Sequence, residues 1–299
     1  MASLKSWIIA ARLRTLPLAV SGFLIGTSLA YNKGAVDYRI AGLTMLTAFL
    51  LQILSNFAND YGDAVSGVDS DERSGPDRMV QSGAITKKAM KSVLIVFSLL
   101  SLISGLALLY YAFPQDWQLA LVFFVVGLSA IAAAVKYTVG KNPYGYAGFG
   151  DAFVFIFFGI VAVFGTYFLQ TKSTDWMVLL PAASLGLFAV GVLNVNNIRD
   201  IDSDQKAGKY SIPVRLGYEK AGTYHALLLS IGLLLSILFA ISDYNHAFQL
   251  AFILMSPLLL KNIRAVRTKS GSELDPFLKQ MAISTLIFSA LFSAGQFFS

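Results

Sequence analysis

The chain has no cysteine and only two histidines in 299 residues. Without cysteine it can form neither a disulfide nor a thiolate metal site. The two histidines, His225 and His246, are far apart in the sequence and offer little basis for a histidine zinc site or a nucleophile triad. Charge is scarce too, because charged residues make up 13% of the chain, about half the share of a typical soluble domain. These absences point away from a soluble enzyme with a histidine- or cysteine-based site.

Hydrophobic residues make up 56% of the chain and are gathered into long runs. A transmembrane helix needs roughly 20 apolar residues. We predict an all-α polytopic membrane protein, organised as a single domain over residues 1–299. The nine predicted transmembrane helices are approximately 16–31, 40–60, 93–113, 118–135, 150–170, 177–197, 224–242, 247–260 and 280–298.

The charged segment Met1–Arg14 resembles the start of a signal peptide, but no small-residue cleavage site is visible and apolar helices follow throughout. We therefore expect 16–31 to be a retained first helix.

The basic residues test the helix count, because cytoplasmic loops of membrane proteins are rich in Lys and Arg. With a cytoplasmic N-terminus, nine helices place all of the 23 basic residues on the inside except Lys33, Arg39 and Lys172. Losing one helix would invert every later segment and spoil this alternation. We therefore attribute the net charge of +6 to basic residues placed by the membrane topology. No basic domain that could hold a nucleic acid is visible, so the lipid bilayer is the expected partner.

Two clusters of amide and carboxylate residues end two of the hydrophobic runs. The first cluster is Asn56, Asn59, Asp60 and Asp63, and the second is Asn196, Asp200 and Asp204. Residues three and four apart share one face of a helix. We therefore expect the oxygens of each cluster to point in one direction. The matched clusters also suggest a pseudo-repeat of helix-plus-loop units near 56–91 and 196–220.

Both clusters have the chemistry of a metal–diphosphate site. Hard oxygen ligands suit Mg²⁺, which commonly binds one or two carboxylates and completes its shell with water and phosphate oxygens. Arginine can take phosphate oxygens bidentately. The basic residues of interest are Arg73 and Arg78 after the first cluster, then Lys209 and Arg215 after the second. The alternatives are that the acids cap helix ends in water and that the bases only follow the topology rule.

The segment 136–151 is dense in glycine and tyrosine at a predicted membrane boundary. Interfacial tyrosine is common in membrane proteins. The alternative is an acceptor site in which a tyrosine ring, such as that of Tyr137, stabilises a cationic intermediate.

Several motifs together resemble the UbiA-type intramembrane prenyltransferases, most closely the members that prenylate 1,4-dihydroxy-2-naphthoate. The resemblance covers essentially the whole chain. One departure from the wider family is Gly67, which stands where a third aspartate is often found. The matching motifs are Arg12–Leu18, Leu51–Val65, Tyr137–Gly140, Pro143–Tyr146, Asn194–Ile201 and Val214–Gly217.

The resemblance implies nine helices around a central cavity in a bacterial cytoplasmic (inner) membrane, with the active site on the cytoplasmic side. It implies Mg²⁺ as cofactor. The implied metal ligands are Asn56, Asp60, Asp63, Asp200 and Asp204. The implied diphosphate-binding residues are Asn56, Arg73, Arg78, Asn196, Lys209 and Arg215. Asp60, Asp200 and Tyr137 are expected to be catalytic, and Lys141 and Arg14 to bind the acceptor.

The implied reaction transfers a polyprenyl group from a polyprenyl diphosphate to 1,4-dihydroxy-2-naphthoate, with loss of CO₂ and diphosphate. Two alternatives stay open: another aromatic acceptor, such as 4-hydroxybenzoate or haem, and a transporter with repeated helices.

Overall fold

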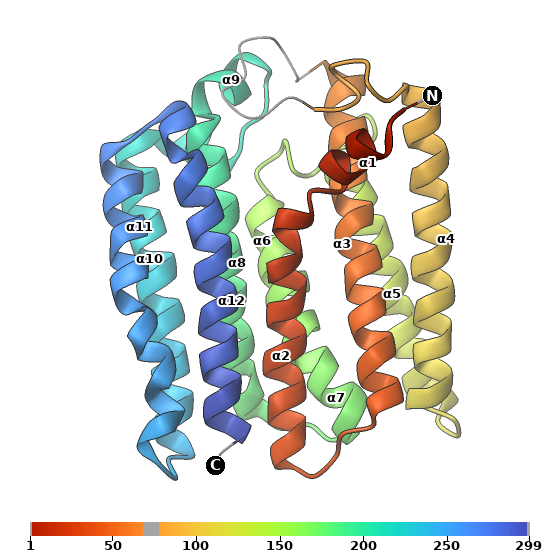
Figure 1. Ribbon diagram of the computed structural model, residues 1–299, viewed down its shortest axis with the longest axis vertical. Helices are drawn as coiled ribbons and strands as arrows, with labels where there is room; N and C mark the ends of the chain where they lie inside the picture. Colours follow the sequence, from red (N-terminus) through yellow and green to blue (C-terminus); the bar gives the residue numbers. More distant parts are fainter. Residues whose placement is uncertain (1, 68–77, 298–299) are drawn as a thin grey trace.

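The computed structural model describes residues 2–67 and 78–297 (Figure 1). Within these residues no β-strand is found, and nine helical segments are long and apolar enough to cross a membrane. The prediction of an all-α bundle with nine spans is confirmed.

The spans consist of continuous helices and of helices extended by short 3₁₀ or π segments. In chain order the elements are α1 (Leu4–Ala11), η1 (Leu13–Thr15), α2 (Leu16–Asn32), α3 (Tyr38–Ser66), α4 (Lys87–Ala112), α5 (Trp117–Lys136), α6 (Gly150–Val154), η2 (Phe155–Gly165), α7 (Thr166–Thr171), η3 (Trp176–Val178), α8 (Leu179–Arg199), α9 (Ile201–Lys206), α10 (Ile212–Ser242), η4 (Ala247–Met255), α11 (Ser256–Thr268), η5 (Gly271–Leu274) and α12 (Asp275–Phe297).

The helices form two groups joined by a middle layer (Figure 1). Helices α3, α4 and α5 pack on one another, and α8, α10, α11 and α12 make up the second group. Helix α2 packs on both α3 and α12, and the π-helical segment η2 packs on α2 and α8. The first predicted cluster lies on α3, and the second runs from Asn196 on α8 to Asp204 on α9, so one cluster lies in each group.

The N-terminal segment is a structural element that the apolar runs did not reveal. Helix α1 begins after Ser3, whose Oγ accepts a hydrogen bond from the Ser6 backbone N–H at 3.1 Å. It ends at Arg12, which has a left-handed backbone with φ of 48°. Figure 1 shows α1 tilted across one end of the bundle rather than running along it. A helix of eight residues is too short to cross a membrane, so hydropathy could not detect it.

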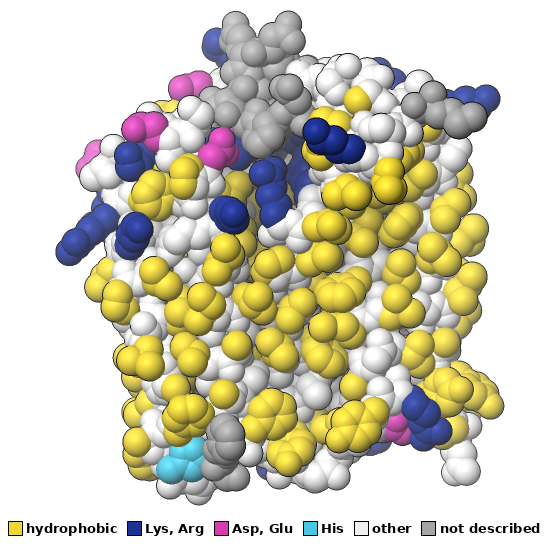
Figure 2. All heavy atoms as spheres, viewed as in Figure 1, with side chains coloured by type: hydrophobic (Ala, Val, Ile, Leu, Met, Phe, Trp, Pro, Cys, Tyr) yellow, Lys and Arg dark blue, Asp and Glu magenta, His cyan; other side chains and the backbone are white. Residues whose placement is uncertain are grey.

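The charged side chains gather mostly at the end of the molecule that carries α1 and α9 (Figure 2). Below them the visible face is a broad apolar band, and a few charged side chains return at the opposite end (Figure 2). This is the surface of a multi-pass membrane protein, because only an apolar band is stable against lipid tails.

Candidate active site

The bundle encloses a cavity of about 520 Å³ with one polar end. Apolar side chains from α2, α3, α4, α5, η2, α8 and α12 line much of the rest of it. Among the residues at the polar end are Arg12, Thr15, Gln52, Asn56, Asn59, Asp63, Arg78, Asn196, Lys209, Asp275 and Lys279. Asn56, Asn59 and Asp63 of the first cluster and Asn196 of the second therefore face one space, whereas Asp200 and Asp204 are not among the described residues that line it. This confirms the prediction of a central cavity.

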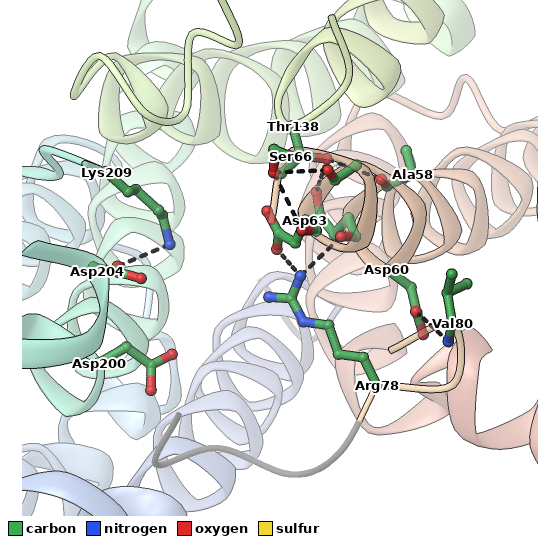
Figure 3. Close-up of polar contacts among 12 residues, drawn as sticks. Ala58, Asp60, Asp63, Ser66, Arg78, Val80, Thr138, Asp200, Asp204 and Lys209 are labelled. Carbon is green, nitrogen blue, oxygen red and sulfur yellow. Dashed lines mark hydrogen bonds and ion pairs between the residues drawn. The ribbon is translucent and has the colours of Figure 1, made fainter. Parts of the chain in front are cut away.

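Within the first cluster, Asp63 is the carboxylate at the cavity. It is buried and forms an ion pair with Arg78 (Figure 3). It also accepts a hydrogen bond from the Tyr146 hydroxyl. Arg78 Nη1 also donates to the backbone carbonyl of Asn59 at 2.9 Å. Burial lowers the pKa of Arg78, and the neighbouring carboxylates of Asp60 and Asp200 oppose that shift. The guanidinium stays charged, because arginine does not lose its proton in proteins.

Asp60 points elsewhere, so the expectation that the whole cluster points one way was wrong for this residue. One carboxylate oxygen accepts a hydrogen bond from the Met79 backbone N–H at 3.1 Å. The other accepts one from the Val80 N–H at 3.0 Å (Figure 3). Asp60 is not among the described residues that line the cavity. The returning loop has backbone donors that need acceptors, and Asp60 supplies them. In this structure Asp60 fixes the loop that presents Arg78.

Asn56 holds the N-terminal turn against the cavity. Its Nδ2 donates to the Ala11 carbonyl and to Thr15 Oγ1, both at 2.8 Å. Gln52 Nε2 donates to the same Thr15 oxygen at 3.0 Å. Between these anchors Arg12 adopts its left-handed conformation and reaches the polar end of the cavity. Sequence reasoning missed Arg12 as a site residue, although it opens the first of the motifs that carry the family resemblance.

The second cluster holds its carboxylates through ion pairs. Arg199 donates two hydrogen bonds to the Asp200 carboxylate, from Nε at 2.8 Å and from Nη2 at 2.7 Å. The same guanidinium donates to Asp275 at 2.8 Å, which ties the end of α8 to the start of α12. Asp204 forms an ion pair with Lys209 at 2.9 Å. Asp200 and Asp204 lie across from Asp63 and Arg78 in Figure 3.

The 137–146 segment packs on α3 through Gly62. A Cβ atom at Gly62 would lie 2.4 Å from Thr138 Oγ1 and 2.6 Å from its carbonyl, so only glycine allows this approach. The Thr138 hydroxyl donates to the Ala58 carbonyl at 2.9 Å. This contact brings Tyr137 to the cavity wall and Tyr146 to Asp63. Sequence reasoning missed the role of Tyr146, because its partner lies 83 positions away in the chain.

Tyr137 presents its ring to the cavity next to the ring of Tyr144, with 5.4 Å between centroids. The two rings meet edge to face. Burial raises the pKa of the Tyr137 hydroxyl, and the charge of Asp151 adds to that shift. The Tyr137 side chain therefore stays neutral and offers an aromatic face at the cavity wall.

The structure places some predicted residues away from the cavity. Arg215 is exposed and bridges two segments, donating to the carbonyls of Tyr210 at 3.1 Å and Ala147 at 2.8 Å. Lys141 is exposed as well, and neither residue is among the described cavity-lining positions. Arg14 does line the cavity. Arg73 lies outside the described residues.

The oxygen donors fit a hard divalent ion in kind, because carboxylates and amides are the ligands that Mg²⁺ takes. Within residues 2–67 and 78–297, no three acidic or histidine residues already form a metal-binding group. The carboxylates of Asp63, Asp200 and Asp204 are instead paired with Arg78, Arg199 and Lys209. The donors thus suit an ion that arrives with anionic ligands of its own, such as phosphate oxygens.

A sequence model of the UbiA prenyltransferase family matches residues 19–286. The chain belongs to this family. The 1,4-dihydroxy-2-naphthoate octaprenyltransferase of Haemophilus influenzae is 45% identical over 98% of this chain and 96% of its own length. The enzyme of that name from Escherichia coli is 42% identical over 99% of this chain and 96% of its own length. The UbiA family membership sets the transporter alternative aside.

Solved structures share the fold. The apo structure of a UbiA homolog from Aeropyrum pernix K1 has a TM-score of 0.67 at 17% identity and covers 99% of this chain and 98% of its own. A UbiA homolog from Archaeoglobus fulgidus bound to DMAPP and Mg²⁺ has a TM-score of 0.64 at 20% identity, covering 95% and 97%.

Proposed function

We propose that this prenyltransferase transfers a polyprenyl group from a polyprenyl diphosphate to 1,4-dihydroxy-2-naphthoate. The products are diphosphate, CO₂ and a prenylated quinol that oxidises to demethylmenaquinone. The observation that carries the proposal is a cavity that joins a polar end, lined by Asn56, Asp63 and Asn196 among others, to a long apolar wall. Such a cavity suits an amphiphilic donor with an anionic head. The names of the two bacterial relatives support the naphthoate acceptor.

Diphosphate binding is assigned to the cations and amides at the polar end. Arg78, Lys209 and Asn196 line it, and Arg73 is assigned to the same task from its place in the first motif. When a diphosphate enters, Arg78 and Lys209 can exchange their carboxylate partners for phosphate oxygens, which bind guanidinium and ammonium groups strongly. That exchange leaves Asp63 and Asp204 available as ligands of Mg²⁺.

Mg²⁺ would be held by Asp63, Asp200 and Asp204, with Asn56 beside them, and would neutralise charge on the leaving diphosphate. We assign Asp60 to the positioning of Arg78, in view of its two bonds to the Met79 and Val80 backbone. Arg215 supports the site indirectly, because it ties the 144–150 segment to residues 208–211.

The chemical step is an electrophilic substitution. The bond between the allylic carbon and the diphosphate oxygen breaks, and the electron pair leaves with the diphosphate. The face of Tyr137 stabilises the positive charge on the allyl group and excludes water. The electron-rich naphthoate ring forms the new C–C bond, and its carboxylate is lost as CO₂. The apolar cavity strengthens every charge interaction around this step.

We further propose that the polar end faces the cytoplasm of a bacterial cell and that the protein lies in the inner membrane. The support is the distribution of Lys and Arg, which are concentrated at this end of the bundle (Figure 2). The positive-inside rule assigns such an end to the cytoplasm.

The test is product analysis by mass spectrometry. Purified protein receives Mg²⁺ and octaprenyl diphosphate with either 1,4-dihydroxy-2-naphthoate or 4-hydroxybenzoate. We expect a prenylated product that lacks the carboxylate, formed from the naphthoate only and abolished by EDTA. Prenylated 4-hydroxybenzoate as the sole product would overturn the proposed acceptor and keep the enzyme class.

A further inference from the structure

One face of helix α12 lines the cavity. The described lining positions of this helix are Asp275, Leu278, Lys279 and Ala282. Their spacing of i, i+3, i+4 and i+7 is that of a single helix face. Helix α12 starts at the charged end of the bundle and runs to the opposite end, where the C-terminus lies (Figure 1). Lys279 therefore places a cation about one helical turn deeper along this face than Asp275.

The rotation of α12 about its axis is fixed by hydrogen bonds on either side of Lys279 in the sequence. Arg199 donates to Asp275 at 2.8 Å, which holds the start of α12 against the end of α8. Gln280, the residue after Lys279, donates from Nε2 to the Leu258 carbonyl of α11 at 3.0 Å. Because α12 is tied to both α8 and α11, its lysine is held toward the cavity.

Lys279 differs from other cations at the polar end in its electrostatic partners. Arg78 and Lys209 form ion pairs with carboxylates of the two clusters. Within the described part of the chain no ion pair is found for Lys279, and Asp275, the acid one turn away, is engaged by Arg199. An incoming anion can therefore bind the Lys279 ammonium group without first displacing a carboxylate of the protein.

The cavity wall beside Lys279 is apolar. Leu278 and Ala282 flank it on the same helix face, and Leu18 of α2 and Val192 of α8 also line the cavity. Both α2 and α8 pack on α12. Apolar surface is favourable for burying an aromatic ring, and an ammonium group forms a strong charge-assisted hydrogen bond with a carboxylate. The chemistry of this wall thus suits an aromatic carboxylate.

We propose that Lys279 binds the carboxylate of the acceptor and is a specificity-determining residue for carboxylated aromatic acceptors. The inference rests on the proposed function and deepens it, because it assigns the acceptor end of the same site. Lys141, which the sequence suggested for this task, is exposed and is not among the described lining residues. Arg14 does line the cavity, so the test includes it.

The first test measures KM for each substrate in Lys279→Met. We expect KM for 1,4-dihydroxy-2-naphthoate to rise about 10- to 100-fold, the range expected for loss of a hydrogen bond between charged groups. KM for octaprenyl diphosphate should stay unchanged, and Lys279→Arg should restore most of the acceptor affinity. Lys261→Met is the matched control, because Lys261 is an exposed lysine of the neighbouring helix α11 and is not among the described lining residues.

Two competitive inhibitors separate recognition of the charge from binding of the ring. In Lys279→Met the inhibition constant of 1-hydroxy-2-naphthoate should rise, whereas that of 1-hydroxy-2-naphthamide should not. A rise in KM for the donor alone would assign Lys279 to the diphosphate and overturn the inference. Loss of the preference for the carboxylate in Arg14→Met, with the preference kept in Lys279→Met, would overturn it as well.

If Lys279→Met does not fold, a measurement on the unmodified protein decides. Lysine side chains are acetylated with an N-hydroxysuccinimide ester, and the modified peptides are quantified by mass spectrometry. Added 1-hydroxy-2-naphthoate should slow the acetylation of Lys279 and leave that of Lys261 unchanged, and equal rates at Lys279 with and without it would overturn the inference. Absence of product from the parent protein with the naphthoate would instead contradict the proposed function.

Discussion

Arg78 and Asp63 form a buried ion pair that joins the segment beginning at Arg78 to the end of α3 (Figure 3). Asp60, one turn earlier, holds the same segment through Met79 and Val80. The two aspartates of the first motif thus have different partners, one a charged side chain at the cavity and the other a pair of backbone N–H groups. Variants that remove these contacts should therefore differ in stability and in their Mg²⁺ requirement.

Arg78→Met should destabilise the protein and abolish activity. It leaves the buried Asp63 carboxylate without its cation, which typically costs about 3–5 kcal/mol. Thermal unfolding in detergent and product formation would measure the two effects. Arg215→Met is the control, because Arg215 bonds only to backbone carbonyls in the interactions described above and is exposed. Equal unfolding temperatures for the two variants would contradict the prediction.

Asp200→Asn and Asp60→Asn should differ in their response to Mg²⁺. Asp200→Asn removes a proposed metal ligand, so we expect the Mg²⁺ concentration for half-maximal activity to rise by about 10- to 100-fold. Asp60→Asn leaves one backbone N–H without its acceptor, which costs about 1–3 kcal/mol of stability, and should leave the Mg²⁺ requirement unchanged. A Mg²⁺ titration of activity, paired with thermal unfolding, separates the two. A raised Mg²⁺ requirement in Asp60→Asn would return that residue to the metal site.

Tyr137→Phe should retain most activity, whereas Tyr137→Leu should lose it. The proposed role uses the aromatic face, whose attraction for a desolvated cation is worth about 2 kcal/mol. Because burial raises the pKa of Tyr137 above its ordinary value near 10, the hydroxyl is neutral below that pH in the folded protein. The pH profile of kcat in Tyr137→Phe should therefore match that of the parent protein between about pH 6 and 9. A limb of the profile that disappears in Tyr137→Phe would show that the hydroxyl takes part.

Gly62→Ala should displace the 137–146 segment. The added Cβ would meet the Thr138 backbone and side chain at 2.4–2.6 Å, and overpacking of this kind typically costs about 1–3 kcal/mol. Activity should fall with stability, because Tyr137 and Tyr146 move with the segment. Gly42→Ala, on the same helix with open space around it, should change neither. A fully active and stable Gly62→Ala would show that the contact between α3 and the 137–146 segment can adjust to the added methyl group.

The nine spans could be predicted from the sequence because each is an apolar run bounded by polar residues, and the basic residues fixed their number. The same signal cannot detect α1, which is too short to cross the membrane. It also underestimates α3 and α8, which continue as helices into their polar motifs as far as Ser66 and Arg199. In these polar motifs the hydropathy is low, although the helical backbone hydrogen bonds continue.

The types of residue at the site could be predicted from the sequence, but the directions of several side chains could not. Helical spacing correctly brought Asn56 and Asp63 to the cavity. It failed for Asp60, because a loop from outside the helix captured that side chain. Arg215 and Lys141 carry the charge expected of a phosphate or carboxylate ligand, yet tertiary structure turns both outward. Tyr146 and Arg12 reach the site only through contacts between distant segments, for which one sequence carries no direct signal.

Because the cavity joins a polar end to a long apolar wall, the donor concentration that determines the rate is its concentration in the membrane. A donor shaped like a lipid stays dissolved in the bilayer and meets the protein by diffusing in two dimensions. Its effective concentration is then its mole fraction among the lipids, not its amount per volume of solution. Adding inert lipid or detergent at fixed total donor dilutes the substrate within its own phase, and the velocity falls accordingly. Rates for this protein therefore have meaning only alongside the lipid content of the assay.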